Sequence, residues 1–154
     1  MPSRRDLIRM SEDEVRAFLA ERHHLAVASH SPDGSIHLVA MWYGFLGANP
    51  ALETFAKSQK VRNLRRDPRF TALVESGTAY EELRGVQIIG RAVIHEDDET
   101  LMVVCRDVAR RYTGVTDPDE VEAVARIMAA KRVAVELVPE KIVSWDHRKL
   151  GGAY

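Results

Sequence analysis

The segment from Ile36 to Phe45 constrains the fold more than any other, because it is apolar on both faces of a strand. Successive side chains of a β-strand point to opposite faces. The apolar residues therefore form two sets: Ile36, Leu38, Ala40 and Trp42 on one face, and Val39, Met41, Tyr43 and Phe45 on the other. A half-exposed antiparallel strand alternates apolar with polar residues. We therefore expect one face to line a barrel interior, and a partner subunit or a flat ligand to cover the other.

Short strands separated by turn signals surround this segment, and they follow one another mostly in hairpin order. We expect seven strands, over residues 24–30, 36–45, 52–56, 69–75, 85–95, 132–138 and 142–145, the last two split at Pro139. Gly90 is expected to mark a bulge or a close backbone approach. Capping signals predict helices over residues 12–21, 58–67, 97–112 and 117–130. This order predicts an α+β protein built on an antiparallel barrel with flanking helices.

The composition is that of an ordinary globular protein, and we expect residues 1–154 to form a single domain. A net charge of −1 argues against generic nucleic-acid binding, although the arginines between Arg62 and Arg69 keep it as an alternative. The lone Cys105 excludes an internal disulfide and a cysteine-rich zinc site. We expect no signal peptide and no membrane partner, and a cytoplasmic location.

The most informative block for function runs from Lys57 to Arg69, which is rich in lysine and arginine. The block predicts a helix that begins near Ser58 and stops before Pro68. Free backbone N–H groups and the helix dipole make its first turn electropositive, and Lys57 and Lys60 add charge there. Such an end is suited to holding a phosphate. The alternative is a solvated surface helix whose arginines pair with neighbouring acids.

Other catalytic signals are weak. The six histidines show no metal spacing, so we expect no metal site. Cys105 falls on the apolar face of a predicted helix, which favours a core position over a catalytic one. The chain lacks a glycine-rich dinucleotide motif and a P-loop. We therefore assign no catalytic residue, and we expect a bound cofactor to carry any redox chemistry.

Four motifs together resemble a known family. They are Lys57-Ser58-Gln59-Lys60 followed by Asn63-Leu64-Arg65-Arg66-Asp67-Pro68-Arg69, Ala40-Met41-Trp42-Tyr43, Leu83-Arg84-Gly85-Val86, and Ser144-Trp145-Asp146-His147-Arg148-Lys149-Leu150. The chain resembles the split β-barrel flavin and deazaflavin oxidoreductases, which include the pyridoxamine 5′-phosphate oxidase-like proteins. It is most similar to the B group, which uses the deazaflavin coenzyme F420. The resemblance extends from about Ser11 to Leu150.

The resemblance implies a split β-barrel homodimer with two cofactor sites at the subunit interface. It implies coenzyme F420 as the cofactor, with FMN as the alternative. The cofactor-binding residues would be Met41, Trp42, Tyr43, Lys57, Ser58, Lys60, Asn63, Trp145 and Lys149. In this arrangement the basic helix would hold the phosphate, the strand Met41-Trp42-Tyr43 would lie along the ring, and Trp145 and Lys149 would come from the other subunit.

The implied reaction transfers hydride from the reduced deazaflavin to an electron-poor double bond of a small planar substrate. One alternative is an FMN-dependent oxidase or reductase, and another is a non-catalytic protein that binds the cofactor or a tetrapyrrole. Charge and helical geometry further suggest that Arg62 and Arg65 meet the polyglutamate tail of the deazaflavin. No acid or base positioned for proton delivery is evident from the sequence.

Overall fold

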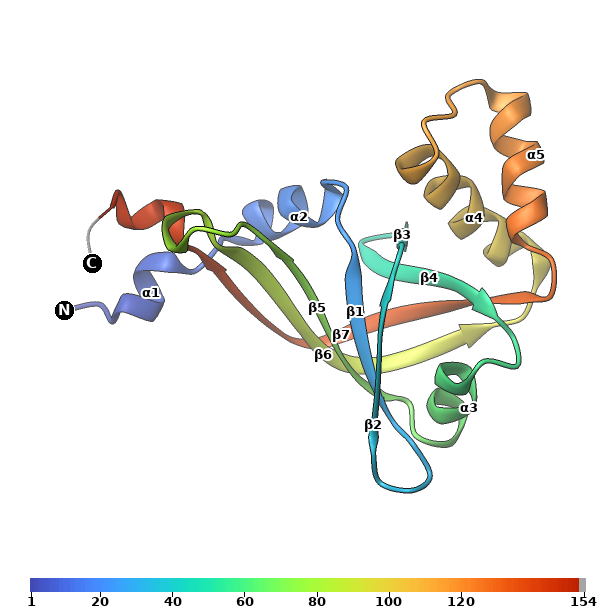
Figure 1. Ribbon diagram of the computed structural model, residues 1–154, viewed down its shortest axis with the longest axis horizontal. Helices are drawn as coiled ribbons and strands as arrows, with labels where there is room; N and C mark the ends of the chain where they lie inside the picture. Colours follow the sequence, from blue (N-terminus) through green and yellow to red (C-terminus); the bar gives the residue numbers. More distant parts are fainter. Residues whose placement is uncertain (153–154) are drawn as a thin grey trace.

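The structure is a computed structural model that describes residues 1–152, and all its strands belong to one antiparallel sheet (Figure 1). The sheet has seven strands in the order β2-β1-β5-β6-β7-β4-β3. The strands are β1 (Leu25–His30), β2 (Ile36–Met41), β3 (Gly44–Leu46), β4 (Asn49–Phe55), β5 (Arg69–Ser76), β6 (Arg84–His95) and β7 (Arg132–Asp146). The helices are α1 (Arg4–Ile8), α2 (Glu12–Ala20), α3 (Gln59–Arg66), α4 (Asp98–Tyr112) and α5 (Pro118–Met128), with 3₁₀ turns η1 (Tyr80–Glu82) and η2 (His147–Leu150).

The two edges of this sheet are joined by a very short connection. Strands β2 and β3 lie at opposite ends of the strand order, yet only Trp42 and Tyr43 separate them in the chain. The three peptide steps from Met41 to Gly44 reach at most about 11 Å. The sheet must therefore curl until its edges approach each other, as Figure 1 shows. This curled antiparallel sheet with flanking helices confirms the predicted α+β split-barrel architecture.

The predicted strand over residues 36–45 is wrong as one continuous element, because Trp42 and Tyr43 interrupt it. Its inner face agrees with the prediction, since Val39, Met41, Tyr43 and Phe45 pack against the main core. Its outer face does not: Ile36 and Leu38 remain 58% and 68% exposed. Their cover by a partner subunit or a ligand stays a prediction.

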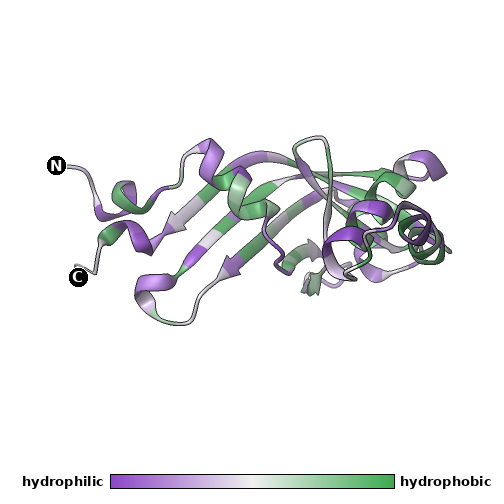
Figure 2. Cartoon of the chain, turned by 90° about the horizontal axis from the view of Figure 1, so that it is seen from above, coloured by the Kyte–Doolittle hydropathy of each residue, from purple (hydrophilic) through white to green (hydrophobic). Residues whose placement is uncertain are grey.

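The core has two parts on the two faces of the sheet. Inside the curl, large side chains such as Leu25, Leu52 and Ile88 pack with the apolar faces of α2 and α3. Outside it, α4 packs on β3, β4 and β7 and α5 packs on α4, with Cys105 buried as predicted. In Figure 2 much of the hydrophobic colour lies along the strands, and the helices are of mixed colour.

The last two predicted strands are one continuous strand, β7, so the predicted split at Pro139 is wrong. The register with β6 shifts between Ile89 and Gly90, and Glu140 is left without a partner opposite. This bulge accommodates Pro139, which cannot donate a ladder hydrogen bond. The prediction for Gly90 is confirmed, because an added Cβ would lie only 1.9 Å from the Val138 carbonyl oxygen.

The remaining helices and strands agree with the predictions to within a few residues, apart from three short elements that were not predicted. These are α1, which Ser3 and Asp6 close with a capping box, and the turns η1 and η2. Strand β4 begins at Asn49, three residues before the predicted start of that strand at residue 52. None of the helices among residues 1–152 has the length and apolar composition that a membrane crossing requires.

We expect Gly90→Ala to lower the free energy of unfolding by about 2–4 kcal/mol, because the backbone must move away from the new methyl group. The comparison variant is Gly114→Ala, which meets open space and suffers only from its positive φ of 76°. That variant should lose about 1 kcal/mol. Urea unfolding of both variants checks this, and a Gly90→Ala protein as stable as the wild type would contradict the close approach.

Candidate functional site

The first turn of α3 contains an incompletely satisfied polar end. Ser58 stands at the N-cap position with extended backbone angles, but its side chain makes no capping hydrogen bond. Its hydroxyl oxygen is sealed from solvent and has no partner among the described residues. The N–H groups of the first helical turn also lack intrahelical acceptors. This end of α3 therefore offers several donors that an anion could accept from.

Lys60 lies in the same turn and is buried, with only 9% of its surface exposed. Its Nζ donates to the Thr54 hydroxyl over 2.9 Å. Burial, and then the nearby positive charge of Arg132, lower the pKa of Lys60 below its usual value. A buried, partly compensated ammonium group is costly for the fold, and a bound anion would stabilise its charged form.

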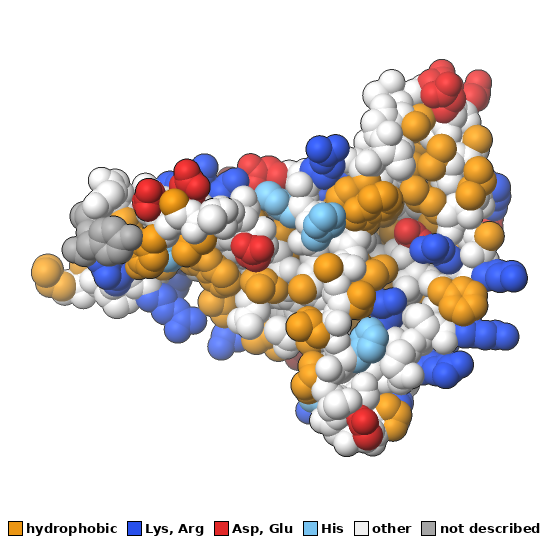
Figure 3. All heavy atoms as spheres, in the orientation of Figure 1, with side chains coloured by type: hydrophobic (Ala, Val, Ile, Leu, Met, Phe, Trp, Pro, Cys, Tyr) orange, Lys and Arg blue, Asp and Glu red, His pale blue; other side chains and the backbone are white. Residues whose placement is uncertain are grey.

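The basic residues of the block divide into two groups. Lys57 and Arg62 are exposed, and Figure 3 shows Lys and Arg side chains gathered at the edge of the molecule over α3 and the end of β4. By contrast, Arg65 pairs with Glu96 over 2.6 Å and Arg69 pairs with Asp67 over 2.6 Å. The second group agrees with the alternative of a surface helix that pairs with acids. The first group, with Lys60, agrees with an anion site.

Asn63 is completely buried and serves as a clamp between α3 and β1. Its Nδ2 donates to the hydroxyls of Ser29 over 3.1 Å and of Ser31 over 3.3 Å. Its Oδ1 accepts from Gln59 over 2.8 Å and from Arg66 over 3.3 Å. Because its polar atoms are engaged within the chain, Asn63 positions the helix end in this structure.

The predicted strand Met41-Trp42-Tyr43 separates into residues with different environments. Tyr43 is fully buried, and its hydroxyl donates to the Leu19 carbonyl over 2.6 Å. Burial raises the pKa of Tyr43 well above its usual range. Trp42 is 42% exposed and stacks on Tyr112 with ring centroids 5.0 Å apart. Of the three, Trp42 therefore has the side chain most open to a planar ligand, and Tyr43 supports it from the core.

Two adjoining cavities share Trp42 and His24. One, of about 520 Å³, is lined by Arg22, His23, His24, Trp42, Glu75 and Tyr112. The other, of about 320 Å³, is lined by His24, Ala40, Met41, Trp42 and Glu53. Cavities of this size, with an aromatic wall and a few polar groups, are typical of small-molecule sites.

Glu53 lies between the smaller cavity, which it lines, and the basic helix, whose Lys60 acts on its charge. The sequence analysis did not name Glu53 as a site residue. It is buried in β4, and its Oε2 accepts from Arg132 of β7 over 2.6 Å. Burial raises the pKa of Glu53, although the positive charges of Arg132 and Lys60 oppose this effect. The one signal in the sequence was an acidic residue inside an otherwise mostly apolar strand.

Trp145 and Lys149 lie elsewhere. They belong to the end of β7 and to η2, at the opposite end of the sheet from α3 (Figure 1). The Trp145 ring packs closely on Gly85, which leaves no room for a Cβ there. The Lys149 Nζ donates to the Arg9 carbonyl over 2.8 Å and to Glu14 over 2.6 Å. Within one chain, the structure does not bring these two residues together with Lys57, Ser58 and Lys60.

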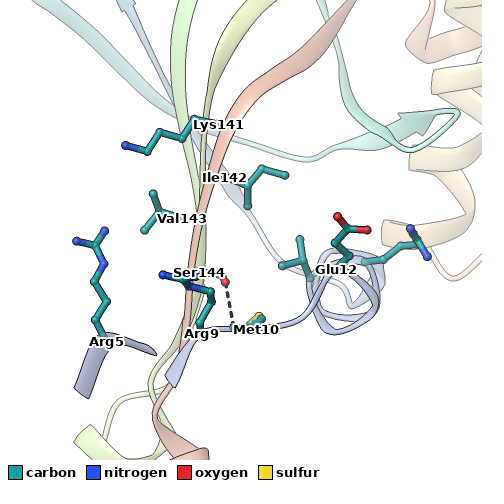
Figure 4. A pocket seen from close by; sticks show the side chains of 10 residues that line it. Arg5, Arg9, Met10, Glu12, Lys141, Ile142, Val143 and Ser144 are labelled. Carbon is teal, nitrogen blue, oxygen red and sulfur yellow. Dashed lines mark hydrogen bonds between the residues drawn. The ribbon is translucent and has the colours of Figure 1, made fainter. Parts of the chain in front are cut away.

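A larger cavity, of about 740 Å³, lies between α1–α2 and β7 (Figure 4). Figure 4 shows Arg5 and Lys141 on one side of β7 and Glu12 on the other. The Met10 N–H donates to the Ser144 hydroxyl over 3.1 Å and ties the α1–α2 link to the strand. None of the predicted cofactor-binding residues lines this cavity, so its size does not make it the candidate site.

This chain is similar to a known protein family and to several solved structures. Residues 11–146 match the model of a family described as pyridoxamine 5′-phosphate oxidase. A conserved hypothetical protein from Mycobacterium tuberculosis is 44% identical, with a TM-score of 0.92 over 99% of this chain and 95% of that one. Among curated proteins, no sequence matches this chain.

Two more distant structures share the fold. One described as an F420 reductase is 23% identical, with a TM-score of 0.61 over 82% of this chain and 94% of that one. The heme storage protein HutZ from Vibrio cholerae is 16% identical, with a TM-score of 0.66 over 86% of this chain and 94% of that one. At these identities the likeness establishes the architecture alone.

We expect Ser58→Ala to change the free energy of unfolding by less than about 0.5 kcal/mol, because no capping bond is lost. The matched control is Ser11→Ala, since Ser11 caps α2 by accepting from the Glu14 N–H over 3.2 Å. That change should cost about 1 kcal/mol. Equal losses in urea unfolding of the two variants would mean that Ser58 caps α3 in solution.

We also expect Lys60 to make stability depend on pH. Its pKa in the folded protein lies below that of the unfolded chain, so the unfolded chain binds the extra proton between the two values. Wild-type stability should therefore rise with pH in the alkaline range below about 10.4, relative to Lys60→Met. Urea unfolding at several pH values measures this difference. The control is Lys57→Met, which removes an exposed lysine of the same block, and parallel curves for wild type and Lys60→Met would contradict the prediction.

Proposed function

This chain belongs to the pyridoxamine 5′-phosphate oxidase family, and we propose that it is an oxidoreductase dependent on coenzyme F420. The reaction we infer is hydride transfer from the reduced deazaflavin to an electron-poor double bond of a small planar substrate. The redox chemistry is supplied by the cofactor when it is bound. The chain contributes binding, orientation and a controlled electrostatic environment.

The observation that carries this proposal is the buried, unpartnered hydroxyl of Ser58 at the start of α3. A polar atom without a partner inside a folded protein is uncommon and calls for an acceptor or donor that binds there. A phosphate oxygen fits, because it can accept from the hydroxyl and from the first-turn N–H groups. Lys57 and Lys60 supply the charge beside it. These residues would hold the cofactor phosphate, and Trp42 would stack on the ring.

We further propose that the protein acts as a homodimer with the cofactor sites at the interface. The outer face of β2 supports this, because its exposed Ile36 and Leu38 need cover that a second copy can supply. Trp145 and Lys149 lie far from α3 within one chain. A second copy is required if all the predicted residues are to meet around one ligand.

Two other ligands have specific support. The family match makes FMN the alternative cofactor on the same residues. The structural likeness to a heme storage protein raises a tetrapyrrole as a second candidate, because His24 and Trp42 line the same two cavities. A histidine beside an aromatic wall is able to ligate heme iron.

We expect the double variant Lys57→Ala, Lys60→Ala to weaken binding of coenzyme F420 at least tenfold, about 1.4 kcal/mol. Titration of the purified protein with the deazaflavin, followed by tryptophan fluorescence, measures the affinity. The control is Arg110→Ala with Arg126→Ala, which removes two exposed positive charges from α4 and α5 on the outer side of the sheet. That control should bind as the wild type does.

The same titration with FMN and with heme separates the alternatives. Tight binding of FMN without a response to the deazaflavin would replace the proposed cofactor. A heme complex whose absorption band is lost in His24→Ala would favour tetrapyrrole binding. Unchanged deazaflavin affinity in the folded double variant would place the phosphate elsewhere.

A further inference from the structure

Strand β4 carries a buried acid, Glu53, that the proposed cofactor site does not use. Only 7% of this residue is exposed, and it lines the cavity of about 320 Å³ together with Met41 and Trp42. Its place in the fold follows from the curl of the sheet. β3 pairs with β4 as far as Gly44 opposite Ala51, so the chain that continues back to Trp42 runs toward Glu53.

Arg132 holds one oxygen of this carboxyl group. The Arg132 Nη1 donates to Glu53 Oε2 over 2.6 Å, and no hydrogen bond to Oε1 is found within residues 1–152. A guanidinium group donates hydrogen bonds but cannot accept them. The proton of a neutral Glu53 therefore resides on Oε1, because Oε2 must stay free to accept from Arg132. The hydrogen bond from Arg132 therefore determines which oxygen of the neutral acid carries the proton.

Charged and titratable groups from several elements face this carboxyl group. Arg132 comes from β7, Lys60 from α3, Cys105 from α4, and His24 from the other wall of the cavity. Burial favours the neutral acid and raises the pKa of Glu53, whereas Arg132 and Lys60 favour the carboxylate. Burial, and then the negative charge of Glu53 when it is ionised, raise the pKa of the Cys105 thiol to about 12. Because burial favours the neutral acid and the two cations stabilise the carboxylate, Glu53 can hold a proton, release it and remain as a stabilised anion.

We propose that Glu53 is the acid that protonates the substrate of the reductase, an inference that rests on the proposed function. In the reduction of an enone, the β-carbon would take a hydride, which the reduced deazaflavin would supply when bound and so become oxidised by two electrons. The electrons of the double bond move to the α-carbon, which takes the proton from Glu53 Oε1. Glu53 is left as a carboxylate paired with Arg132, and solvent returns its proton. The substrate class is an α,β-unsaturated carbonyl compound small and flat enough to lie beside Trp42.

The test compares Glu53→Gln with the wild type in single turnovers of reduced F420 with 2-cyclohexen-1-one. Glutamine keeps an acceptor for Arg132 but cannot act as the acid. We expect the enone rate to fall at least about 100-fold, the usual size of a general-acid contribution. Reduction of menadione should change by less than about threefold, because a quinone takes its protons on oxygen, which water can supply. Retained menadione turnover also shows that the variant is folded and binds the cofactor.

The pH profile supplies a second measurement. The wild-type enone rate should fall as pH rises through the pKa of Glu53, because the acid form is lost, and Glu53→Asp should show a profile of the same shape. The matched control is Glu122→Gln, an acid of α5 that accepts from Arg106 over 2.6 Å and lines neither of the two cavities around Trp42. That variant should keep both the rate and the profile of the wild type.

The possible results distinguish failure of the proposed function from failure of the inference about Glu53. If the wild type binds neither F420 nor FMN, the proposed cofactor site is wrong. If it binds F420 but turns over neither probe, the reductase proposal fails and this inference fails with it. If the wild type reduces the enone and Glu53→Gln does so at a similar rate, the inference alone is overturned.

Discussion

The crossing of the chain from one edge of the sheet to the other, at Trp42 and Tyr43, is the constraint on which the rest of the structure depends. The last turns of α4 hold it in place. Asp107 accepts from the Phe45 N–H over 2.9 Å, and Arg111 donates to the Tyr43 carbonyl over 3.0 Å. The Tyr112 ring stacks on Trp42, while Arg111 also lies over the Tyr43 ring. These contacts pair the Phe45 N–H and the Tyr43 carbonyl at the point where strand pairing stops, which removes the cost of leaving those two backbone groups unpaired.

The same closure creates the candidate site. By directing Tyr43 into the core and Trp42 outward, it gives a planar ligand one exposed aromatic wall. By bringing β4 beside that wall, it places Glu53 at the cavity and Thr54 against Lys60. Two of the polar groups there, the buried ammonium of Lys60 and the buried carboxyl of Glu53, cost folding free energy. A protein that keeps such groups in its interior is expected to use them.

The comparisons with solved structures fit this division between scaffold and site. An F420 reductase and a heme storage protein share the architecture at low identity, so the curled sheet alone does not select a ligand. In the function we propose, selection depends on side chains at two places, the start of α3 and the cavities around Trp42. The first would recognise an anion and the second a flat ring, so a phosphate-bearing cofactor would satisfy both.

The sequence by itself determined the structural features that depend on residues close together in the chain. Capping residues and prolines placed the helix ends, as at Ser58 and Pro68, and the periodicity of apolar residues identified the strands and the barrel. The basic block was predicted to be an anion site because charge and helix start lie within a few residues of each other, and that assignment stays a prediction. Local signals act over a turn or a strand, so this part of the fold could be predicted directly from the sequence.

Only the tertiary structure decided how distant residues combine. The pair of Glu53 and Arg132 joins residues 79 positions apart, and no local pattern predicts it. The strand break at Trp42 and Tyr43 follows from closure of the sheet, and the continuity of β7 through Pro139 follows from a bulge opposite Gly90. The distance of Trp145 from α3 likewise depends on the length and curl of β7. Burial and hydrogen-bond pairing are properties of the packed chain. They place Trp145 and Lys149 far from the α3 residues with which the sequence analysis had grouped them.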